Sequence, residues 1–238
     1  YAVFTGGRAL SENLQLDRLV TPAMGGEATV DIGTLPGISV REMDWAPLIA
    51  GKQPQKDPLA ALVPADQHAL FFPSFDAYVG VLDEAKRYGT PVLRLLEPRS
   101  EDACTTERYE RQLCMKTDAL SRLLGPQVIG SMAFTGSDPF LRTGSDVAVL
   151  FEPKEAGVLK GLLQARLSAA LQANPQAAAL QGTVEEVPYA GVRSPDRSIC
   201  SYLASVGDAV VAANSLEQLR RIVAVQKGQA PSLASLPE

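Results

Sequence analysis

The chain has 238 residues, of which 46% are hydrophobic and 21% are charged. These ordinary globular values exclude overall disorder, and a chain of this length buries enough apolar surface to fold without a metal or a disulfide. The 22 basic and 27 acidic residues give a net charge of −5, without a Lys/Arg block that could track a phosphate backbone, so nucleic acid is not an expected partner. No apolar run approaches the ~20 residues of a membrane span, and residues 1–15 lack the layout of a signal peptide.

The N-terminal part of the chain is turn-rich and poorly periodic. Glycines and prolines interrupt two short β-like pieces at residues 28–32 and 38–41, and a polar stretch at residues 51–58 has the composition of a linker. We therefore expect residues 1–56 to be an N-terminal extension or partial unit, and residues 57–238 to form the main domain. Both ends of the sequence look cut, so we expect a mature or fragmentary form of a larger protein.

Periodicity predicts the first elements of the main domain. A short strand is expected at residues 67–72. It is followed by a helix that Ser74 caps and whose apolar side chains recur at helical spacing over residues 75–85. A second helix fits residues 106–124, with a glycine and a proline as its end signal.

The strongest pattern lies further along the chain. It predicts strands at residues 128–134 and 147–151, a helix at 155–173, strands at 184–192, 198–206 and 208–213, and a last helix opened by a capping box at Ser215. From residue 147 onwards the order is β-α-β-β-β-α. This order predicts an α+β fold, a mainly antiparallel sheet with the helices packed on one face.

Several short motifs of this domain occur together in one known family. They are Leu-Val-Pro-Ala-Asp at residues 62–66, Asp-Val-Ala-Val-Leu-Phe at 146–151, Tyr-Ala-Gly-Val at 189–192 and Gly-Asp-Ala-Val-Val-Ala-Ala-Asn-Ser at 207–215. Through them, about residues 59–238 resemble a family of bacterial envelope proteins catalogued as a domain of unknown function. The resemblance implies a larger parent, exported behind an N-terminal membrane anchor, with no established activity. It also implies an extracytoplasmic location (periplasmic, envelope or secreted) and other chains of an envelope assembly as partners.

Thr-Gly-Ser-Asp occurs twice in close succession, at residues 135–138 and 143–146, and the second copy runs into a predicted strand. A Gly-Ser turn before a strand with two carboxylates on one face resembles the nucleotidyltransferase signature, in which the carboxylates hold catalytic divalent metal. Because strand residues i and i+2 share a face, Asp146 needs a carboxylate at the position of Ala148. Glu152 shares that face but lies about 20 Å away at ~3.3 Å per residue, too far to share an ion.

Other interpretations of this loop remain open. Successive N–H groups of the Gly-Ser turns could cradle an anion, and Asp138 and Asp146 could share a hard cation such as calcium. A plain hairpin is the simpler interpretation, because Gly, Ser, Asp and Pro each favour turns. If the loop binds a ligand, the candidate residues are Ser137, Asp138, Ser145 and Asp146.

The three cysteines are Cys104, Cys114 and Cys200. A bridge between Cys104 and Cys114 would indicate an oxidising compartment. Ten residues of continuous helix would separate their Cα atoms by ~15 Å, whereas a disulfide needs less than ~7 Å, so the bridge requires Cys104 to lie in a loop that folds back. The alternative is two unpaired thiols, with Cys200 as a small buried hydrophobe.

The remaining sequence shows no complete catalytic or metal-binding pattern. His68 is the only histidine and alternates with apolar residues in a predicted strand without a nucleophile motif, so we expect a structural role. No zinc-ligand spacing and no phosphate- or dinucleotide-binding glycine motif occurs, so we expect no metal and no cofactor. Trp45 is expected to pack the N-terminal extension onto the sheet.

The sequence therefore predicts a non-catalytic extracytoplasmic domain with a role in binding or assembly. The alternative is a metal-dependent phosphotransfer or nucleotidyltransferase-like enzyme centred on the doubled Thr-Gly-Ser-Asp loop. The two hypotheses give the same carboxylates different roles, structural in the first and catalytic in the second.

Overall fold

The computed structural model describes residues 44, 46–51, 55–96, 103–141 and 144–236. The chain divides into two units, one of residues 56–90 and 101–238 and one of residues 1–55 and 91–100. The first, which we call the sheet unit, begins beside the boundary predicted at residue 56, whereas residues 91–100 group with the N-terminal part. The domain division drawn from the sequence stays a prediction.

Little of the second unit is described. Its elements are α2 (Ala46–Ile49) and the last residues of α3 (Phe75–Leu96). Trp45 and the β-like pieces predicted at residues 28–32 and 38–41 lie outside the described residues.

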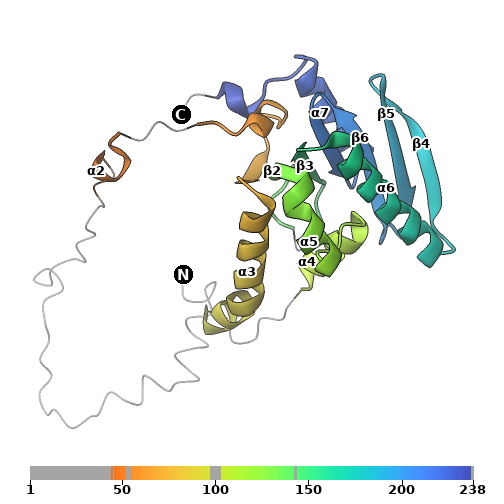
Figure 1. Cartoon of the computed structure of the whole chain (residues 1–238), viewed down its shortest axis with the longest axis horizontal. Coiled ribbons are helices and arrows are strands. Elements are labelled where there is room, and N and C mark those ends of the chain that lie inside the picture. The colour runs from red at the N-terminus through yellow and green to blue at the C-terminus, as the bar shows by residue number, and fades with distance from the viewer. Residues whose placement is uncertain (1–43, 45, 52–54, 97–102, 142–143, 237–238) are drawn as a thin grey trace, which may run out of the picture. The chain divides into compact units, whose positions relative to one another are not determined.

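The sheet unit contains one sheet of seven strands, in the order β1-β2-β3-β7-β6-β5-β4 (Figure 1). The strands are β1 (His68–Phe72), β2 (Ile129–Gly136), β3 (Val147–Pro153), β4 (Ala178–Val184), β5 (Val187–Arg193), β6 (Cys200–Val206) and β7 (Ala209–Ala213). Every neighbouring pair is antiparallel. The predicted α+β class and the antiparallel sheet are confirmed.

Helices cover both faces of this sheet rather than the single face that the sequence predicted. They are α3, α4 (Thr105–Gln112), α5 (Ala119–Val128), α6 (Ala156–Ala173) and α7 (Leu216–Gln226), with the short 3-10 helices η3 (Pro58–Ala61) and η4 (Leu233–Ser235). On one side, the α7 face, Leu219, Ile222 and Val223 pack onto the sheet. On the other, the α6 face, the core takes Leu159 and Leu167 from α6 and further residues from α3, α4 and α5.

The reason for two helical layers is the burial of the central strands. All five residues of β7 and the first five of β3 are buried, without the alternation expected of a strand with one wet face. A strand buried on both sides needs an apolar layer on each. In the sequence, the continuous apolar runs of β3 and β7 indicate that these strands are buried on both faces.

One strand was not predicted. The strand expected at residues 184–192 covers the turn and most of β5, whereas most of β4 lies before it. The order from β3 onwards is therefore β-α-β-β-β-β-α, with β4 and β5 paired as a hairpin. Its two-residue turn is Glu185 and Glu186, whose φ angles are 49° and 70°. Positive φ at both turn positions is the type I′ geometry, which Asn-Gly or Gly-Gly usually adopts. Two glutamates do not indicate such a turn in the sequence.

The helix predicted at residues 106–124 is two helices, α4 and α5. Cys114 lies just beyond α4 with φ of 58°, a left-handed conformation that ends a helix. Asp118 then caps α5, accepting a hydrogen bond from the backbone N–H of Ser121 at 2.9 Å. The proline expected to end the helix, Pro126, lies inside α5.

Other predicted boundaries are confirmed. Ser74 Oγ accepts a hydrogen bond from Ala77 N at 3.1 Å at the start of α3, and Ser215 Oγ accepts one from Gln218 N at 3.0 Å at the start of α7. The helix predicted at residues 155–173 is α6.

Two glycines inside helices should respond to alanine in opposite directions. A Cβ at Gly125 would lie 2.5 Å from the Phe75 ring, so we expect Gly125→Ala to lower the free energy of unfolding by about 1–3 kcal/mol. Apart from its chain neighbours and the backbone of α6 itself, no described atom lies within 4 Å of the corresponding position at Gly161, so Gly161→Ala should raise the free energy of unfolding by about 0.5–1 kcal/mol through helix propensity. Denaturant titration of both variants measures this, and equal effects would contradict the packing.

Candidate functional site

The doubled motif forms the connection from β2 to β3, residues 137–146, of which residues 142–143 lie outside the described part. Its first copy is tied across the connection, because Ser137 N donates to Asp146 O at 3.3 Å. Asp138 Oδ1 accepts a hydrogen bond from Phe140 N at 2.8 Å, an Asx turn of the kind that Asp-Pro sequences favour. The carboxylate of Asp138 thus stabilises its own turn.

The serine of the second copy holds the two ends of the connection together. Ser145 Oγ donates to Asp138 O at 2.8 Å, and Ser145 N donates to the Tyr109 hydroxyl at 2.9 Å. Tyr109 in turn donates to Leu141 O at 3.2 Å, and Arg108 also donates to that carbonyl. Helix α4 therefore fixes the connection on the α6 face.

The carboxylate of Asp146 faces the opposite side of the sheet. Its Oδ2 accepts a hydrogen bond from Ser215 Oγ at 3.0 Å, and Ser215 caps α7. Ala148, on the same face two residues on, is fully buried in the apolar core. Neighbouring residues of the second copy thus tie the start of β3 to helices on both faces, Ser145 to α4 and Asp146 to α7.

Asn214 completes this arrangement and was not singled out in the sequence. Its Oδ1 accepts from Val147 N at 2.8 Å, while its Nδ2 donates to Ser145 O at 2.9 Å and to Gln112 Oε1 at 3.0 Å. The side chain is 5% exposed, so these groups depend on one another rather than on solvent. Asn214 directly follows β7, and only the strand order reveals that it lies beside the start of β3.

The four candidate ligand residues are therefore brought together, but mainly to hold one another. Ser145 and Asp138 are joined directly, Ser137 and Asp146 are joined through their backbones, and the two carboxylates have different hydrogen-bond donors. Within the described ranges, no three His, Cys, Asp or Glu side chains group closely enough to hold a metal ion. The geometry is that of a braced hairpin connection.

The candidate disulfide residues lie at the two ends of α4. Cys104 is the residue before α4, which starts at Thr105, and Cys114 lies just after it. Because the helix runs between them, the required fold-back does not occur and the two cysteines are not bridged to each other. Burial, with a smaller contribution from Cys200, raises the pKa of Cys114 to about 11, which keeps this thiol protonated at neutral pH.

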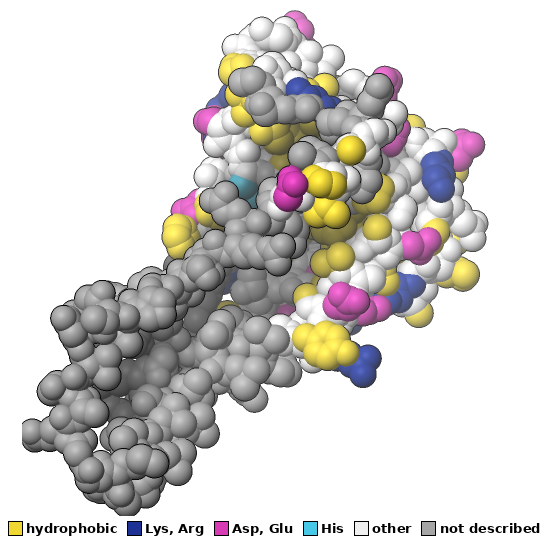
Figure 2. Space-filling view, turned by 90° about the vertical axis from the view of Figure 1, so that its left-hand side faces the viewer, with side chains coloured by type: hydrophobic (Ala, Val, Ile, Leu, Met, Phe, Trp, Pro, Cys, Tyr) yellow, Lys and Arg dark blue, Asp and Glu magenta, His cyan; other side chains and the backbone are white. Residues whose placement is uncertain are grey.

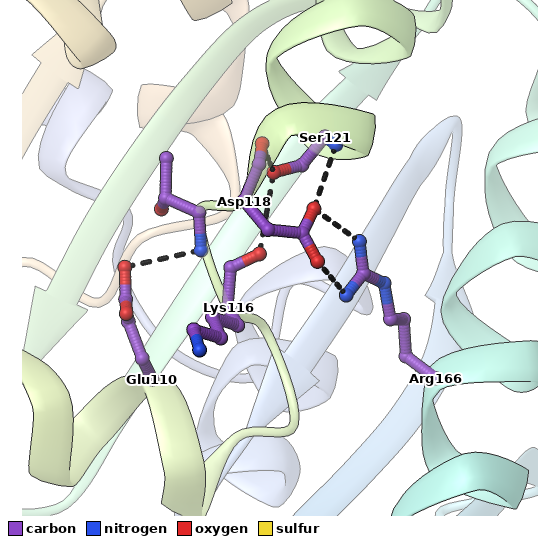
Figure 3. A network of polar contacts seen from close by, with 6 residues as sticks. Glu110, Lys116, Asp118, Ser121 and Arg166 are labelled. Atoms are coloured by element: carbon purple, nitrogen blue, oxygen red, sulfur yellow. Dashed lines mark hydrogen bonds and ion pairs between the residues drawn. The ribbon is translucent and has the colours of Figure 1, made fainter.

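A polar network centred on Asp118 joins the helices of the α6 face (Figure 3). Asp118 accepts two hydrogen bonds from the Arg166 guanidinium, at 2.5 and 2.7 Å, in addition to its capping bond from Ser121. Ser121 Oγ donates to Lys116 O at 3.2 Å, and Glu110 Oε1 accepts a hydrogen bond from Thr117 N at 3.2 Å. The network links the loop between α4 and α5 to α6, so its role is structural.

This network changes the protonation of Asp118. The hydrogen bonds from Arg166 hold the pKa of the Asp118 carboxyl far below its ordinary range, and those from Ser121 act in the same direction against partial desolvation. Asp118 therefore stays ionised well into the acidic range. A permanently ionised, bidentate partner of arginine is suited to bracing and unsuited to proton transfer near neutral pH.

Two further polar groups lie inside the sheet unit. Gln67 and Gln218 exchange reciprocal amide hydrogen bonds of 2.7 Å, and Thr135 Oγ1 donates to Gln67 Oε1 at 3.0 Å, so this buried network is satisfied. His68 packs its ring against Gly136, and its Nδ1 is buried without a hydrogen-bond partner among the described residues. The structural role expected of His68 stays a prediction, with which the close packing of its ring against Gly136 is compatible.

The described surface carries mixed charge. On the face shown in Figure 2, acidic and basic side chains of the described residues are interspersed with hydrophobic ones, and neither sign gathers into a patch there. No helix in the described part of the chain combines the length and apolar character required to cross a bilayer.

No protein-family model, curated protein or solved structure matches this chain. The resemblance of residues 59–238 to an envelope family therefore stays a prediction.

The side chain of Asn214 should contribute more to stability than the exposed carboxylate in the same connection. Asn214→Ala leaves the buried Val147 N–H and two acceptors without their partner, so we expect a loss of about 2–3 kcal/mol in the free energy of unfolding. Asp138→Ala removes one exposed turn bond and should cost less than about 1 kcal/mol. Chemical denaturation compares them, and a larger loss for Asp138→Ala would contradict the assignment.

The contribution of the Asp118–Arg166 pair should depend on pH in a defined direction. Because the pKa of Asp118 is lowered in the folded state, its stabilisation is present above the unfolded pKa near 4 and is lost as the pH falls below it. Asp118→Asn keeps a capping oxygen and loses the charge. The free energy of unfolding of wild type should therefore exceed that of this variant by about 1 kcal/mol at pH 7, and the two values should converge in acid.

Asp118→Ala provides the control, since it removes the cap as well. We expect Asp118→Ala to lower the free energy of unfolding by about 1 kcal/mol more than Asp118→Asn does. This difference between the two variants should depend little on pH, because both lack the charge. Unfolding titrations between pH 7 and pH 2 measure both differences. A difference between wild type and Asp118→Asn that stays constant across this range would contradict the pKa shift.

Proposed function

We propose that this chain is a non-catalytic extracytoplasmic domain of an envelope or secreted protein, acting in binding or assembly. The observation that carries the proposal is the outer edge of β4. Five of its seven residues are exposed, namely Ala178, Ala179, Gln181, Gly182 and Thr183. An exposed edge strand presents a row of backbone donors and acceptors to which another strand can pair.

The roles of the loop residues support a non-catalytic interpretation. In the alternative enzyme, Asp146 would hold metal with a second carboxylate on its own face, and that position is the buried Ala148. Asp138 and Asp146 each accept a hydrogen bond that stabilises the fold, from Phe140 N and from Ser215 Oγ. Side chains used in this way are poorly placed to bind a substrate as well.

The proposed location rests on the sequence. It draws on the short motifs that resemble the envelope family, and on the expectation of a larger exported parent. Partners of the same envelope assembly would meet this domain as folded chains. An exposed sheet edge is one of the recurring modes by which such chains associate.

Calorimetry separates the proposal from the enzyme alternative. We expect wild-type protein titrated with Mg²⁺, Mn²⁺ or a nucleoside triphosphate to give no saturable heat, because the carboxylates of the connection are engaged in the fold. The matched variant carries Asp138→Asn and Asp146→Asn together, and its titration should be the same. Saturable heat in wild type that this variant loses would establish a metal or nucleotide site and overturn the proposed function.

A further inference from the structure

The geometry of the β4 edge points to one partner, and we propose that β4 pairs antiparallel with β4 of a second copy of this chain about a two-fold axis. This inference rests on the proposed function, since it names the partner of the edge described there. The pairing joins two seven-stranded sheets into one continuous sheet.

Strand β4 has none of the devices that usually protect an edge. Its seven residues, Ala-Ala-Leu-Gln-Gly-Thr-Val, include no charge and no proline. Its register with β5 runs without a bulge from Ala178 opposite Arg193 to Val184 opposite Val187. Natural edge strands are commonly kept from pairing by short length, lysine, proline or a bulge. A regular and uncharged edge of this length is therefore suited to pairing.

The hairpin register defines which backbone groups face outward. Val184 and Val187 flank the two-residue turn, so they form the closing pair that exchanges hydrogen bonds. Because strand backbone groups alternate in direction, the N–H and C=O groups of every second residue from Val184 point towards β5. Those of the residues between, Ala179, Gln181 and Thr183, point to the open edge.

These three residues are self-complementary. A two-fold axis at Gln181 pairs Gln181 with its own equivalent and Ala179 with Thr183 of the second copy, so each outward group meets a partner. Antiparallel neighbours on one face interact across the pair, and the uncharged side chains at these positions bring no charge repulsion. The axis is perpendicular to the sheet, so the α7 faces of the two copies lie on the same side.

Charge near the two ends of β4 agrees with this orientation. The acidic turn residues Glu185 and Glu186 follow one end, and Arg193 lies opposite Ala178 at the other. The axis brings the acidic end of β4 in each copy beside the Ala178 end of β4 in its partner. Because Arg193 lies one strand further on, in β5, the acidic turn is about two strand spacings, or 10 Å, from Arg193 of the other copy. Glu186 contacts Lys227 at 3.4 Å with its side chain 94% exposed, so it remains accessible.

The size of the contact predicts a reversible association. One strand pairing with another buries less surface than a standard stable interface, so we expect dissociation in the micromolar range. The contact is isologous and uses the same edge of both copies, which closes the assembly as a dimer. The opposite edge, β1, has a different length and sequence and does not extend it.

Sedimentation velocity across micromolar to sub-millimolar concentrations tests the proposal on the whole chain. Wild type should pass from monomer to dimer. Gln181→Lys places two like charges together at the axis and should raise the dissociation constant about tenfold or more. Gln127→Lys makes the same change at an exposed position of α5, which packs on β2 rather than on β4, and should leave the association unchanged.

Amide hydrogen exchange supplies a readout that needs no variant. At dimer-forming concentrations the amides of Ala179, Gln181 and Thr183 should gain protection, whereas those of Leu180 and Gly182, which point towards β5, should be protected at all concentrations. Gln181→Pro removes an outward N–H without removing a bond to β5, so it should abolish dimerisation while the domain still unfolds cooperatively.

Three outcomes overturn the inference. They are wild type that stays monomeric at every concentration, association that Gln181→Lys does not weaken, and dimerisation without new protection at the three outward amides. Each leaves the proposed function to be judged by its own calorimetric test. A monomer whose outward amides are protected only by a different added protein would mean that the edge takes another partner, which also ends the second-copy assignment.

Discussion

The sheet is buried on both faces at its centre, and the arrangement of the sheet unit follows from this constraint. Strands β3 and β7 bury consecutive residues, so each face needs its own apolar cover. The two covers differ in side-chain size. On the α7 face the central strands contribute the small residues Ala133, Ala148, Ala204 and Ala213 beside larger ones such as Leu150 and Val211, and the alanines leave room for the large side chains of α7. On the α6 face they contribute mostly larger ones, Val149, Phe151, Leu203 and Val210, against several helices.

The burial of β3 on both faces also explains the hydrogen bonds of the doubled Thr-Gly-Ser-Asp motif. Where a strand enters a core covered on both sides, water cannot satisfy the backbone groups at its start, so protein groups have to. Asn214 bonds Val147 N, while Ser145 and Asp146 reach helices on opposite faces. The polar residues of this motif, which the sequence offers as catalytic candidates, are needed to bond the backbone at the start of β3, because that strand is buried on both faces.

The elements that the sequence predicted well are those whose signals are local. Helix α6 has a long apolar periodicity, α7 starts at a capping serine, and β6 and β7 meet at a Gly-Asp turn. The division between α4 and α5 depends on Cys114 in a left-handed conformation, which a non-glycine residue adopts only when its surroundings hold it there. Strand β4 was hidden for a similar reason, because alanine-rich sequence favours helix and two glutamates are unusual turn residues.

Contacts distant in sequence could not be predicted. The sequence gives no indication that Asn214 meets Ser145, or that Gln67 meets Gln218, until the strand order places β7 beside β3 and α7 over the sheet. Parity, in contrast, was predictable. The alternation of strand residues places Ala148 on the face of Asp146, which excludes a second carboxylate there, and the burial of Ala148 agrees with this.

Burial decreases from the centre of the sheet to its edges, and the two edge strands differ in how far another strand could pair with them. β1 is short and is followed at once by Pro73, which limits how far another strand could pair with it. β4 is longer, and part of its packing comes from within the hairpin, where the Tyr189 ring covers Gly182 so closely that a Cβ there would lie 2.8 Å from the hydroxyl. An aromatic side chain covering a strand glycine stabilises the hairpin without shielding its outer backbone groups. The hairpin thus secures β4 from its inner side and leaves the outward amides and carbonyls of that strand available to another chain.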